Sequence, residues 1–167
     1  MRYWLMKSEP DEFSIDDLAR APRQTTPWFG VRNYQARNFM RDQMHPGDRL
    51  FFCHSSCDEP GIAGIAEVMS DAYPDVTQFD RKSPYFDPKA TREAPRWFNV
   101  DVKLVRKTPL VGLAELRRHP VLEDMRVLAR GNRLSVTPVE PKEWAFIAAK
   151  LLGPAPFPRA PLRARNP

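Results

Sequence analysis

The chain has 167 residues, of which 42% are hydrophobic and 28% are charged. These values suit one globular domain with a sizeable core, and hardly two. No apolar run approaches the roughly 20 residues that cross a bilayer, and the start lacks a secretory apolar segment. We therefore expect no membrane partner and a cytoplasmic protein, or a nuclear one if the source is eukaryotic.

The net charge of +5 is concentrated in the C-terminal stretch. The last 14 residues hold three arginines, five prolines and no acidic residue. Without them 23 basic and 21 acidic residues remain, a net charge of +2. A basic tail can add sequence-independent attraction to phosphates. The folded part is only mildly basic, so bulk charge alone does not indicate a nucleic-acid-binding protein.

The predicted elements of the first third alternate between strands and helices. Residues 2–7 form a buried strand, and Ser14 can cap a short helix over 14–21. After a proline-containing loop, a helix over 31–44 has one apolar face and one polar face. The turn HPGD then leads to a strand over 49–54, which has apolar side chains on both sides.

Two more strands are predicted in the middle of the chain. Residues 61–69 contain glycines that permit close approach of a neighbouring backbone or a ligand. Residues 97–105 alternate between apolar and polar side chains, which is typical of a half-buried strand. The polar, proline-containing stretch 70–96 between them is long for a connection, and such loops are usually functional or mobile.

The last third predicts short helical pieces over 112–119 and 121–128, a loop over 130–138 and a final helix. Pro141 suits the first turn of that helix, and Gly153 with the following proline ends it. All elements together predict an α+β fold, in which helices pack against a small, mostly antiparallel curved sheet or barrel.

The sequence contains no recognisable catalytic template. A nucleophile elbow, a P-loop, a dinucleotide-binding glycine motif and a His-Glu-x-x-His motif are all missing. Two cysteines, Cys53 and Cys57, are too few for a disulfide framework, and with His54 they fall short of a four-ligand zinc site. We therefore expect a protein that is not an enzyme and that needs no metal or cofactor.

Aromatic residues near the ends of predicted elements are the strongest indication of a binding site. Trp4, Trp28 and Trp97 all occupy such positions, although a tryptophan is more often a core residue. Trp28 differs from the others because a polar, basic helix follows it at once. Its position suits a stacking wall above a helix N-terminus with unpaired backbone N–H groups.

Several motifs in a fixed order resemble the EVE domain family, which belongs to the PUA-like superfamily. They are KSEP, WFGVRNYQARNF, MHPGD, FFCHSS, GIAGIAEV, AYPD, QFDRKSPYFDPKA, PRWFNVDV and RGNRLSVTP. The resemblance runs from about residue 3 to residue 152. It defines an EVE (PUA-like) domain over 1–153 and leaves a Pro/Arg-rich tail over 154–167.

The resemblance implies a pseudo-β-barrel with flanking helices and one pocket for a modified nucleobase. It also implies DNA or RNA bearing modified bases as the partner of a monomeric protein, with modified cytosine as a leading candidate. Cys53 stands where the family commonly has a tyrosine. The positions that match the family pattern, and therefore the expected binding residues, are Lys7, Ser8, Glu9, Trp28, Gly30, Val31, Arg32, Asn33, His54, Ser55, Trp97, Arg133, Leu134 and Ser135.

Each of these residue types suits one task in such a pocket. Trp28 and Trp97 can stack on a base, because stacking contributes about 1–3 kcal/mol per base. The polar side chains of Asn33, Ser8 and Ser55 can read a base edge.

The charged candidates are of two kinds. Lys7, Arg32 and Arg133 are suited to a phosphate or a base edge. Glu9 either accepts from an exocyclic amine or caps the next turn, and His54 is either a hydrogen-bonded strand residue or a base contact.

Two other functions stay open on the sequence. His54 and Glu9 are the available acid–base pair if the protein acts on a modified nucleotide or RNA. The loop over 70–96 and the basic tail are the segments that a protein-interaction module would use.

Overall fold

The computed structural model describes residues 1–154 of the chain, and the tail beyond Pro154 lies outside the described residues. The strands are β1 (Tyr3–Ser8), β2 (Thr25–Pro27), β3 (Arg49–His54), β4 (Gly61–Val68), β5 (Tyr73–Pro74), β6 (Phe98–Asn99), β7 (Asp101–Gly112) and β8 (Val136–Val139). The α-helices are α1 (Ile15–Arg20), α2 (Tyr34–Asn38), α3 (Leu113–Leu116) and α4 (Pro141–Phe146). Single turns of 3-10 helix occur at Pro22–Gln24, Val76–Phe79, Pro120–Leu122 and Arg126–Leu128, and turns of π-helix extend α2 over Phe39–Gln43 and α4 over Ile147–Leu151.

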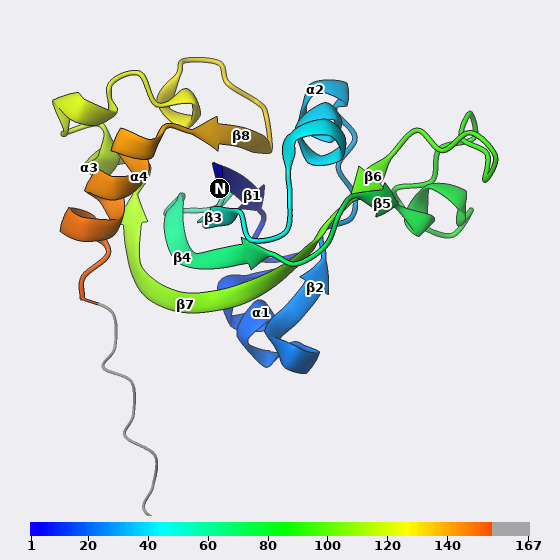
Figure 1. Ribbon diagram of the computed structural model, residues 1–167, viewed down its shortest axis with the longest axis horizontal. Coiled ribbons are helices and arrows are strands. Elements are labelled where there is room, and N and C mark those ends of the chain that lie inside the picture. The colour runs from blue at the N-terminus through cyan, green and yellow to red at the C-terminus, as the bar shows by residue number, and fades with distance from the viewer. Residues whose placement is uncertain (155–167) are drawn as a thin grey trace, which may run out of the picture.

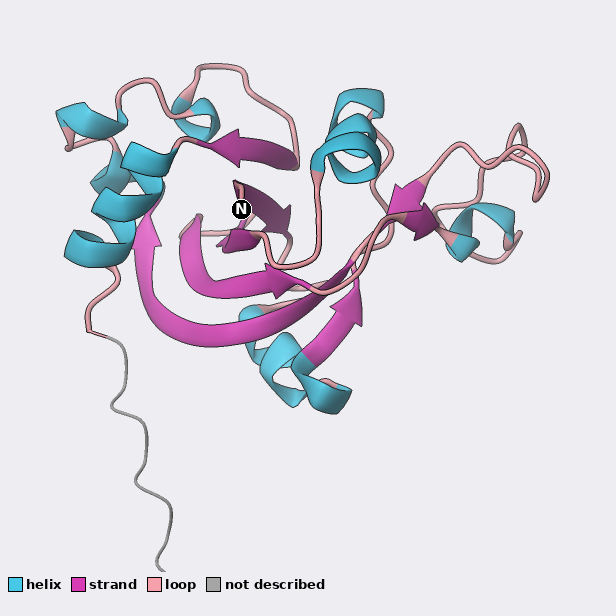
Figure 2. Cartoon of the chain, viewed as in Figure 1, coloured by secondary structure: helices cyan, strands magenta, loops and turns pink. Residues whose placement is uncertain are grey.

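Six strands form one sheet in the order β2-β7-β4-β3-β1-β8, and β5 pairs with β6 in a separate ribbon. Neighbouring strands of the sheet are antiparallel except for β1 and β3, which run parallel. The sheet curves strongly along the long strand β7 (Figure 1). Helices flank the sheet and do not interrupt it (Figure 2).

The predicted α+β class, with a mostly antiparallel sheet and flanking helices, is confirmed. Within residues 1–154 the curved sheet stays open and does not close into a barrel, because β2 and β8 are its two edges and do not pair with each other. No helix in the described part of the chain is long and apolar enough to cross a membrane.

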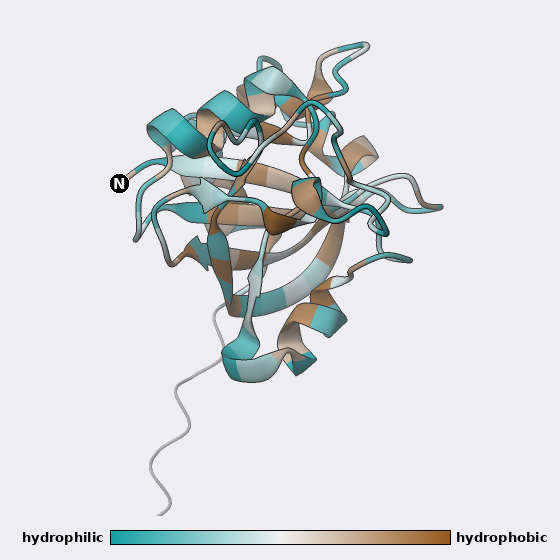
Figure 3. Cartoon of the chain, turned by 90° about the vertical axis from the view of Figure 1, so that its right-hand side faces the viewer, coloured by the Kyte–Doolittle hydropathy of each residue, from teal (hydrophilic) through white to brown (hydrophobic). Residues whose placement is uncertain are grey.

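The core consists of two apolar clusters, and side chains alternate between them along each central strand. In β3, Leu50 and Phe52 belong to one cluster, whereas Phe51 and Cys53 belong to the other. The first cluster is completed by α1 and α2, the second by α3, α4 and the turns around Leu122. Hydrophobic segments gather between the elements, while loops and outer helix sides are mainly hydrophilic (Figure 3).

The ribbon strand β5 was not predicted, because it lies within the 70–96 stretch. The same holds for the two edge strands of the main sheet, β2 and β8, because each lies in a stretch interpreted as a loop. Each contains a proline, Pro27 and Pro138, and proline lacks the N–H that a central strand needs. Both strands are sheet edges, where a missing donor is tolerated. The prediction of loops over 22–27 and 130–138 is therefore wrong for these residues.

Three predicted elements have different bounds. The helix predicted over 31–44 begins at Tyr34, because Asn33 is its N-cap and accepts a hydrogen bond from the Ala36 N–H. The strand predicted over 97–105 divides at Val100, so that β6 pairs with β5 while β7 joins the main sheet. The helical stretch predicted over 121–128 consists of two separate 3-10 turns.

Other local predictions are confirmed. Ser14 and Asp17 form a reciprocal capping box at α1. Glycine is required at the start of β4, since a Cβ on Gly61 would lie 2.3 Å from the carbonyl oxygen of Val111. This is the close backbone approach that the glycines of 61–69 predict.

Candidate functional site

The carboxyl ends of the parallel strands β1 and β3 create the candidate site. Ser8 and His54 are register partners at these ends, and the Ser55 N–H donates to the Ser8 carbonyl at 3.0 Å. On the other side of β1, the Lys7 N–H donates to the Ser135 carbonyl at 2.8 Å. Three stretches that are far apart in the sequence therefore meet at one place.

A cavity of about 340 Å³ lies at this place. The coil between β2 and α2 covers its other side. Ten of the fourteen predicted residues line it: Lys7, Ser8, Glu9, Trp28, Gly30, Val31, Arg32, Asn33, Ser55 and Ser135. The size is within the range of ordinary small-ligand pockets.

Two further hollows adjoin this cavity and share lining residues with it. The first, of about 450 Å³, contains two more predicted residues, His54 and Arg133, and meets the cavity at Lys7, Glu9 and Ser55. The second, of about 370 Å³, is more apolar and shares five lining residues with the cavity: Ser8, Glu12, Trp28, Phe29 and Tyr85.

Trp28 forms part of the cavity wall and is also anchored in the core. Only 7% of the residue is exposed, and its indole meets the Phe52 ring edge-on with centroids 5.3 Å apart. Its backbone N–H donates to the Val100 carbonyl at 2.8 Å. The indole is therefore held in one orientation, with part of its surface lining the cavity.

Gly30 belongs to the coil between β2 and α2, residues 28–33, which we call the cavity coil. It allows this coil to approach Tyr85 of the 70–96 loop. Its φ of +84° lies in the left-handed region, and a Cβ there would lie 2.8 Å from the Tyr85 ring. The Tyr85 hydroxyl donates to Glu12 at 3.1 Å, which connects the loop to the segment after β1. Burial raises the pKa of the Tyr85 phenol.

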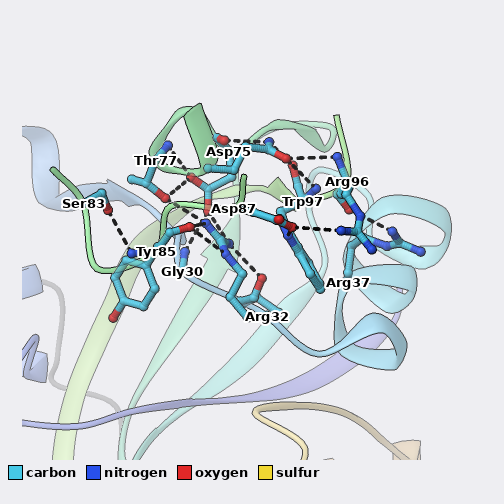
Figure 4. A network of polar contacts seen from close by, with 12 residues as sticks. Gly30, Arg32, Arg37, Asp75, Thr77, Ser83, Tyr85, Asp87, Arg96 and Trp97 are labelled. Atoms are coloured by element: carbon cyan, nitrogen blue, oxygen red, sulfur yellow. Dashed lines mark hydrogen bonds and ion pairs between the residues drawn. The ribbon is translucent and has the colours of Figure 1, made fainter. Parts of the chain in front are cut away.

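Arg32 fastens the coil to the same loop (Figure 4). Its Nε and Nη2 donate to the Tyr85 carbonyl, Nη2 also donates to Thr77, and Nη1 donates to the Val31 carbonyl and to Asp75. An arginine has five N–H groups, and all five are used here. The structure thus gives Arg32 a structural role and leaves it no N–H for a phosphate.

Asp75 is the acidic centre of this network. Its side chain is fully buried and accepts from the Gly30 N–H at 2.8 Å, from Thr77 at 2.5 Å and from Arg32 at 3.1 Å. Burial alone would raise the pKa of this carboxyl, but the hydrogen bonds from Thr77, Gly30 and Arg32 lower it below its ordinary value. Asp75 is therefore ionised at neutral pH.

The polar groups around the cavity differ in what they have left to offer a ligand. The Ser8 hydroxyl donates to the Phe13 carbonyl at 2.6 Å, so its oxygen can still accept. The Asn33 side-chain oxygen caps α2, and within residues 1–154 no hydrogen bond engages its amide NH₂. The helix N-terminus predicted as the cavity floor reaches the cavity only through its N-cap Asn33, because the first-turn residues from Tyr34 on do not line it.

Lys7 and Glu9 bring charge to the rim that the cavity shares with the hollow of about 450 Å³, and Arg133 brings charge to that hollow alone. Within the described residues no hydrogen bond or ion pair engages the side chain of any of the three. The turn after β1 is closed by the Glu9 backbone carbonyl, which accepts from Glu12 and Phe13. The alternative that the Glu9 side chain caps this turn is therefore wrong.

His54 is a half-buried, hydrogen-bonded strand residue, as the first of its two interpretations has it. Its Nε2 accepts from the Ile15 N–H at 3.1 Å, and its ring meets Phe52 edge-on. Burial lowers the pKa of this imidazole, so the ring is neutral at pH 7.

Two predicted residues, Trp97 and Leu134, line neither the cavity nor the two adjoining hollows. Trp97 is 6% exposed, its indole N–H donates to Asp87 at 2.7 Å, and its ring stacks on Tyr34. It therefore does not form a second wall opposite Trp28. Leu134 also lies outside the lining, and its N–H donates to the side chain of Asn132.

Three lining residues, Glu12, Phe29 and Tyr85, were not predicted. Phe29 is 52% exposed, which is unusual for a large apolar residue. An aromatic residue in the polar loop 70–96 was the available sign for Tyr85, but its partner Gly30 is 55 positions away. Only the fold reveals that pairing.

The cysteines do not form a metal site. Cys53 is buried, which raises the pKa of its thiol to about 12, and Cys57 is half-buried. Within residues 1–154 no three His, Cys, Asp or Glu side chains are grouped so as to hold a metal ion.

Comparison with known proteins identifies relatives over almost the whole described chain. The EVE domain family profile matches residues 2–150. Thymocyte nuclear protein 1 of Gallus gallus is 44% identical over 163 residues, which cover 87% of this chain and 66% of that protein. The Homo sapiens protein of the same name is also 44% identical, with 87% of this chain and 72% of that protein covered.

Solved structures agree with this comparison. A crystal structure from Pseudomonas putida is 51% identical with a TM-score of 0.84, covering 88% of this chain and 97% of that one. The crystal structure of human THYN1 in complex with DNA containing 5-methylcytosine is 42% identical with a TM-score of 0.86. It covers 93% of this chain and all of that one.

Proposed function

This chain belongs to the EVE domain family, and we propose that it binds DNA carrying a modified base, which leaves its stack and enters the cavity beside Trp28. The observation that carries the proposal is that residues distant in the sequence line the same cavity. Ten residues from four separate stretches line one cavity of about 340 Å³, in a chain whose human relative was solved with 5-methylcytosine DNA. Modified cytosine is accordingly the first base to test.

The energy of such binding has two main parts. Extruding a base costs a few kcal/mol, and contact with an aromatic ring returns about 1–3 kcal/mol. Trp28 supplies this contact, and its packing on Phe52 removes the need to order the indole on binding. The remaining cost is offset by hydrogen bonds to the base edge and by phosphate contacts.

Recognition of the base edge falls to the polar groups that still have capacity. The Asn33 amide can donate, the Ser8 hydroxyl can accept, and the Ser55 hydroxyl can accept or donate. Glu9 can accept from an exocyclic amine such as that of cytosine. Lys7, on the rim shared with the hollow of about 450 Å³, and Arg133, which lines that hollow, can meet the phosphates beside the extruded base.

The geometry gives less support to the two other functions. As a catalytic base, His54 would have to give up the hydrogen bond that its Nε2 accepts from Ile15. The adaptor function uses the loop over 70–96, whose Asp75 and Tyr85 are already engaged by Arg32, and the tail over 154–167, which lies outside the described residues apart from Pro154. Neither has an observation of its own in its favour.

Direct binding to short oligonucleotides of one sequence tests the proposal. The set contains single- and double-stranded DNA and RNA, each unmodified or with modified cytosine or adenine, at two salt concentrations. We expect a preference for one modified base that persists at the higher salt, because phosphate contacts weaken with salt whereas pocket contacts do so much less.

Variants at Asn33 separate recognition from folding. Asn33→Ser keeps an oxygen that can cap α2 and removes the amide donor, whereas Asn33→Ala also removes the cap, at a cost of about 1 kcal/mol. We expect both variants to lose base preference and only Asn33→Ala to lose stability. Equal, weak and salt-sensitive binding to every oligonucleotide by the native protein would refute the proposal.

Trp28 needs a graded pair because it is part of the core. Trp28→Phe retains an aromatic face, and Trp28→Leu retains bulk without one. We expect Trp28→Phe to keep most of the affinity and Trp28→Leu to lose about tenfold, with unfolding curves confirming that both are folded. Equal affinities for the two variants would rule out stacking on this residue.

A further inference from the structure

The residue that follows the cavity lining is an exposed aromatic. Tyr34 begins α2 directly after Asn33, and 47% of its surface is exposed. Its ring lies on the Trp97 indole, with centroids 4.9 Å apart and planes 25° from parallel. The cavity coil thus leads straight to a stack of two aromatic rings with the outer ring open to solvent.

Two arginines lie close to the Tyr34 ring. The Arg37 guanidinium carbon is 4.7 Å from the Tyr34 centroid and 5.8 Å from the Trp97 centroid. If the guanidinium stood opposite Trp97 across the Tyr34 ring, its distance to Trp97 would approach the sum of the Arg37–Tyr34 and Tyr34–Trp97 distances. It is far shorter, so the Arg37 guanidinium does not stand directly opposite Trp97 across the Tyr34 ring.

Arg96 also lies at the edge of the ring. Its Nη2 donates to the Tyr34 hydroxyl, and its guanidinium carbon is 5.6 Å from the ring centroid. The hydroxyl is in the plane of the ring, so this bond holds Arg96 at the rim. Two guanidinium groups therefore border the Tyr34 ring.

The stack is held rigidly by the loop that Arg32 fastens. Asp87 accepts from the indole N–H of Trp97, and the buried Gln78 side chain bonds both the N–H and the carbonyl of Trp97. Trp97, Arg37 and Arg96 lie together on the side of Arg32 that faces away from Tyr85 (Figure 4). Tyr34 stacks on this fixed indole, so its ring loses little conformational entropy when a ligand stacks on its other face.

The cations indicate which ligand fits this platform. Three of the five Arg37 N–H groups are used within residues 1–154, by Asn38 and by the Arg96 carbonyl, which leaves two for an incoming anion. A flat ring beside two guanidinium groups suits a flat aromatic group that carries a phosphate. Arg96 is also paired with Asp87 at 3.3 Å, so an apolar protein segment would leave the Arg37 charge unmatched.

We propose that Tyr34 is an external stacking platform for the nucleotide next to the one in the cavity, with Arg37 and Arg96 at its phosphate. This inference rests on the proposed function, because it takes the neighbouring nucleotide to be brought there by the base in the cavity. The platform reads no base identity, since every base has a flat face. It adds affinity without changing the preference for a modified base.

The test combines affinity with a fluorescent neighbour. Oligonucleotides with modified or unmodified cytosine carry 2-aminopurine at the position before or after it. Native protein should quench the fluorophore at one of the two positions. Tyr34→Leu, which keeps an apolar cover on Trp97, should abolish that quenching and weaken binding roughly 5- to 100-fold for modified and unmodified DNA alike.

Two control variants make the result specific. Tyr34→Phe removes the hydroxyl and keeps the ring, so it should quench like the native protein and lose much less affinity than Tyr34→Leu, because only the hydrogen bond to Arg96 is lost. Tyr73→Leu changes another exposed aromatic residue, 37% exposed and outside the cavity lining, and should have no effect on either readout. Unfolding curves check that each variant is folded.

The outcomes separate this inference from the proposed function. Unchanged affinity and quenching in folded Tyr34→Leu, with base preference intact in the native protein, would overturn the platform alone. Loss of base preference together with loss of binding in Tyr34→Leu would also overturn it, because the ring would then act in recognition. A native protein without base preference would instead overturn the proposed function.

Discussion

Replacing Arg32 with lysine distinguishes a structural arginine from one that binds phosphate. The variant keeps the positive charge and loses the planar fork. Five N–H groups now reach four acceptor groups: the carbonyls of Val31 and Tyr85, the Thr77 hydroxyl and the Asp75 carboxylate. A lysine ammonium is a point donor and cannot reach all of them at once.

The expected loss can be estimated from these contacts. A hydrogen bond contributes about 1 kcal/mol net, and removing the partner of a buried charge costs about 3–5 kcal/mol. Lysine retains a charge, and Asp75 keeps its bonds from Gly30 and Thr77, so the loss is reduced to about 2–3 kcal/mol. For a chain of this size the melting temperature should fall by about 5–10 °C.

Thermal and urea unfolding of Arg32→Lys measure this loss, with Arg41→Lys as the control. Arg41 pairs with Asp42 on the surface, and that change should cost less than about 0.5 kcal/mol. If Arg32→Lys had the melting temperature of the native protein but bound DNA more weakly, the structural role would be refuted. The result would support a phosphate contact by Arg32 instead.

Acid titration adds a second readout of the same pair. The folded-state pKa of Asp75 is lowered, so the stabilisation by its ionised form is fully present above the unfolded pKa of about 3.9. It disappears as the pH falls through the folded pKa. The difference between native protein and Arg32→Lys should therefore shrink below pH about 4.

Three further predictions concern the cavity and its surroundings. Gly30→Ala should lower stability by about 1–3 kcal/mol and weaken base binding, because a Cβ would meet the Tyr85 ring at a positive φ; unchanged unfolding and binding curves would count against this reading. A thiol reagent should label Cys57 in the folded protein and reach Cys53 only in denaturant, because burial raises the Cys53 pKa to about 12; rapid labelling of both would be inconsistent with the buried position. The native protein should lose stability below pH about 6.5, because burial lowers the pKa of His54 and the unfolded chain therefore takes up a proton on this imidazole at a higher pH than the folded protein does. His54→Gln should not show this loss. Urea unfolding at pH 7.5 and 5.5 measures this difference, and equal pH dependence of the two proteins would contradict it.

Local sequence patterns predicted much of the fold because they act over a few residues. The capping box of Ser14 and Asp17, the two-sided apolar pattern of 49–54 and the glycines of 61–69 all exert their effects on near neighbours or on the adjacent strand. Edge strands escaped prediction because Pro27 and Pro138 weaken the strand signal at positions that need only one hydrogen-bonded partner.

The order of motifs also predicted most of the cavity lining. The KSEP, WFGVRN and HSS motifs supply residues that end up around one cavity. Their convergence depends on the parallel pairing of β1 with β3, which places two carboxyl ends side by side. A sequence pattern does not contain that pairing, because the strands are more than forty residues apart.

The sequence by itself determined the α+β class, the family and the residue types at the cavity. Only the tertiary structure decided what each of these side chains does. Arg32 and Trp97 are residue types that often contact nucleic acids. In this fold, however, the N–H groups of Arg32 donate to Asp75 and Tyr85 of the distant loop, and the indole N–H of Trp97 donates to Asp87 of the same loop. A donor binds whichever acceptor the fold brings within about 3 Å, and that choice is made by contacts between distant parts of the chain.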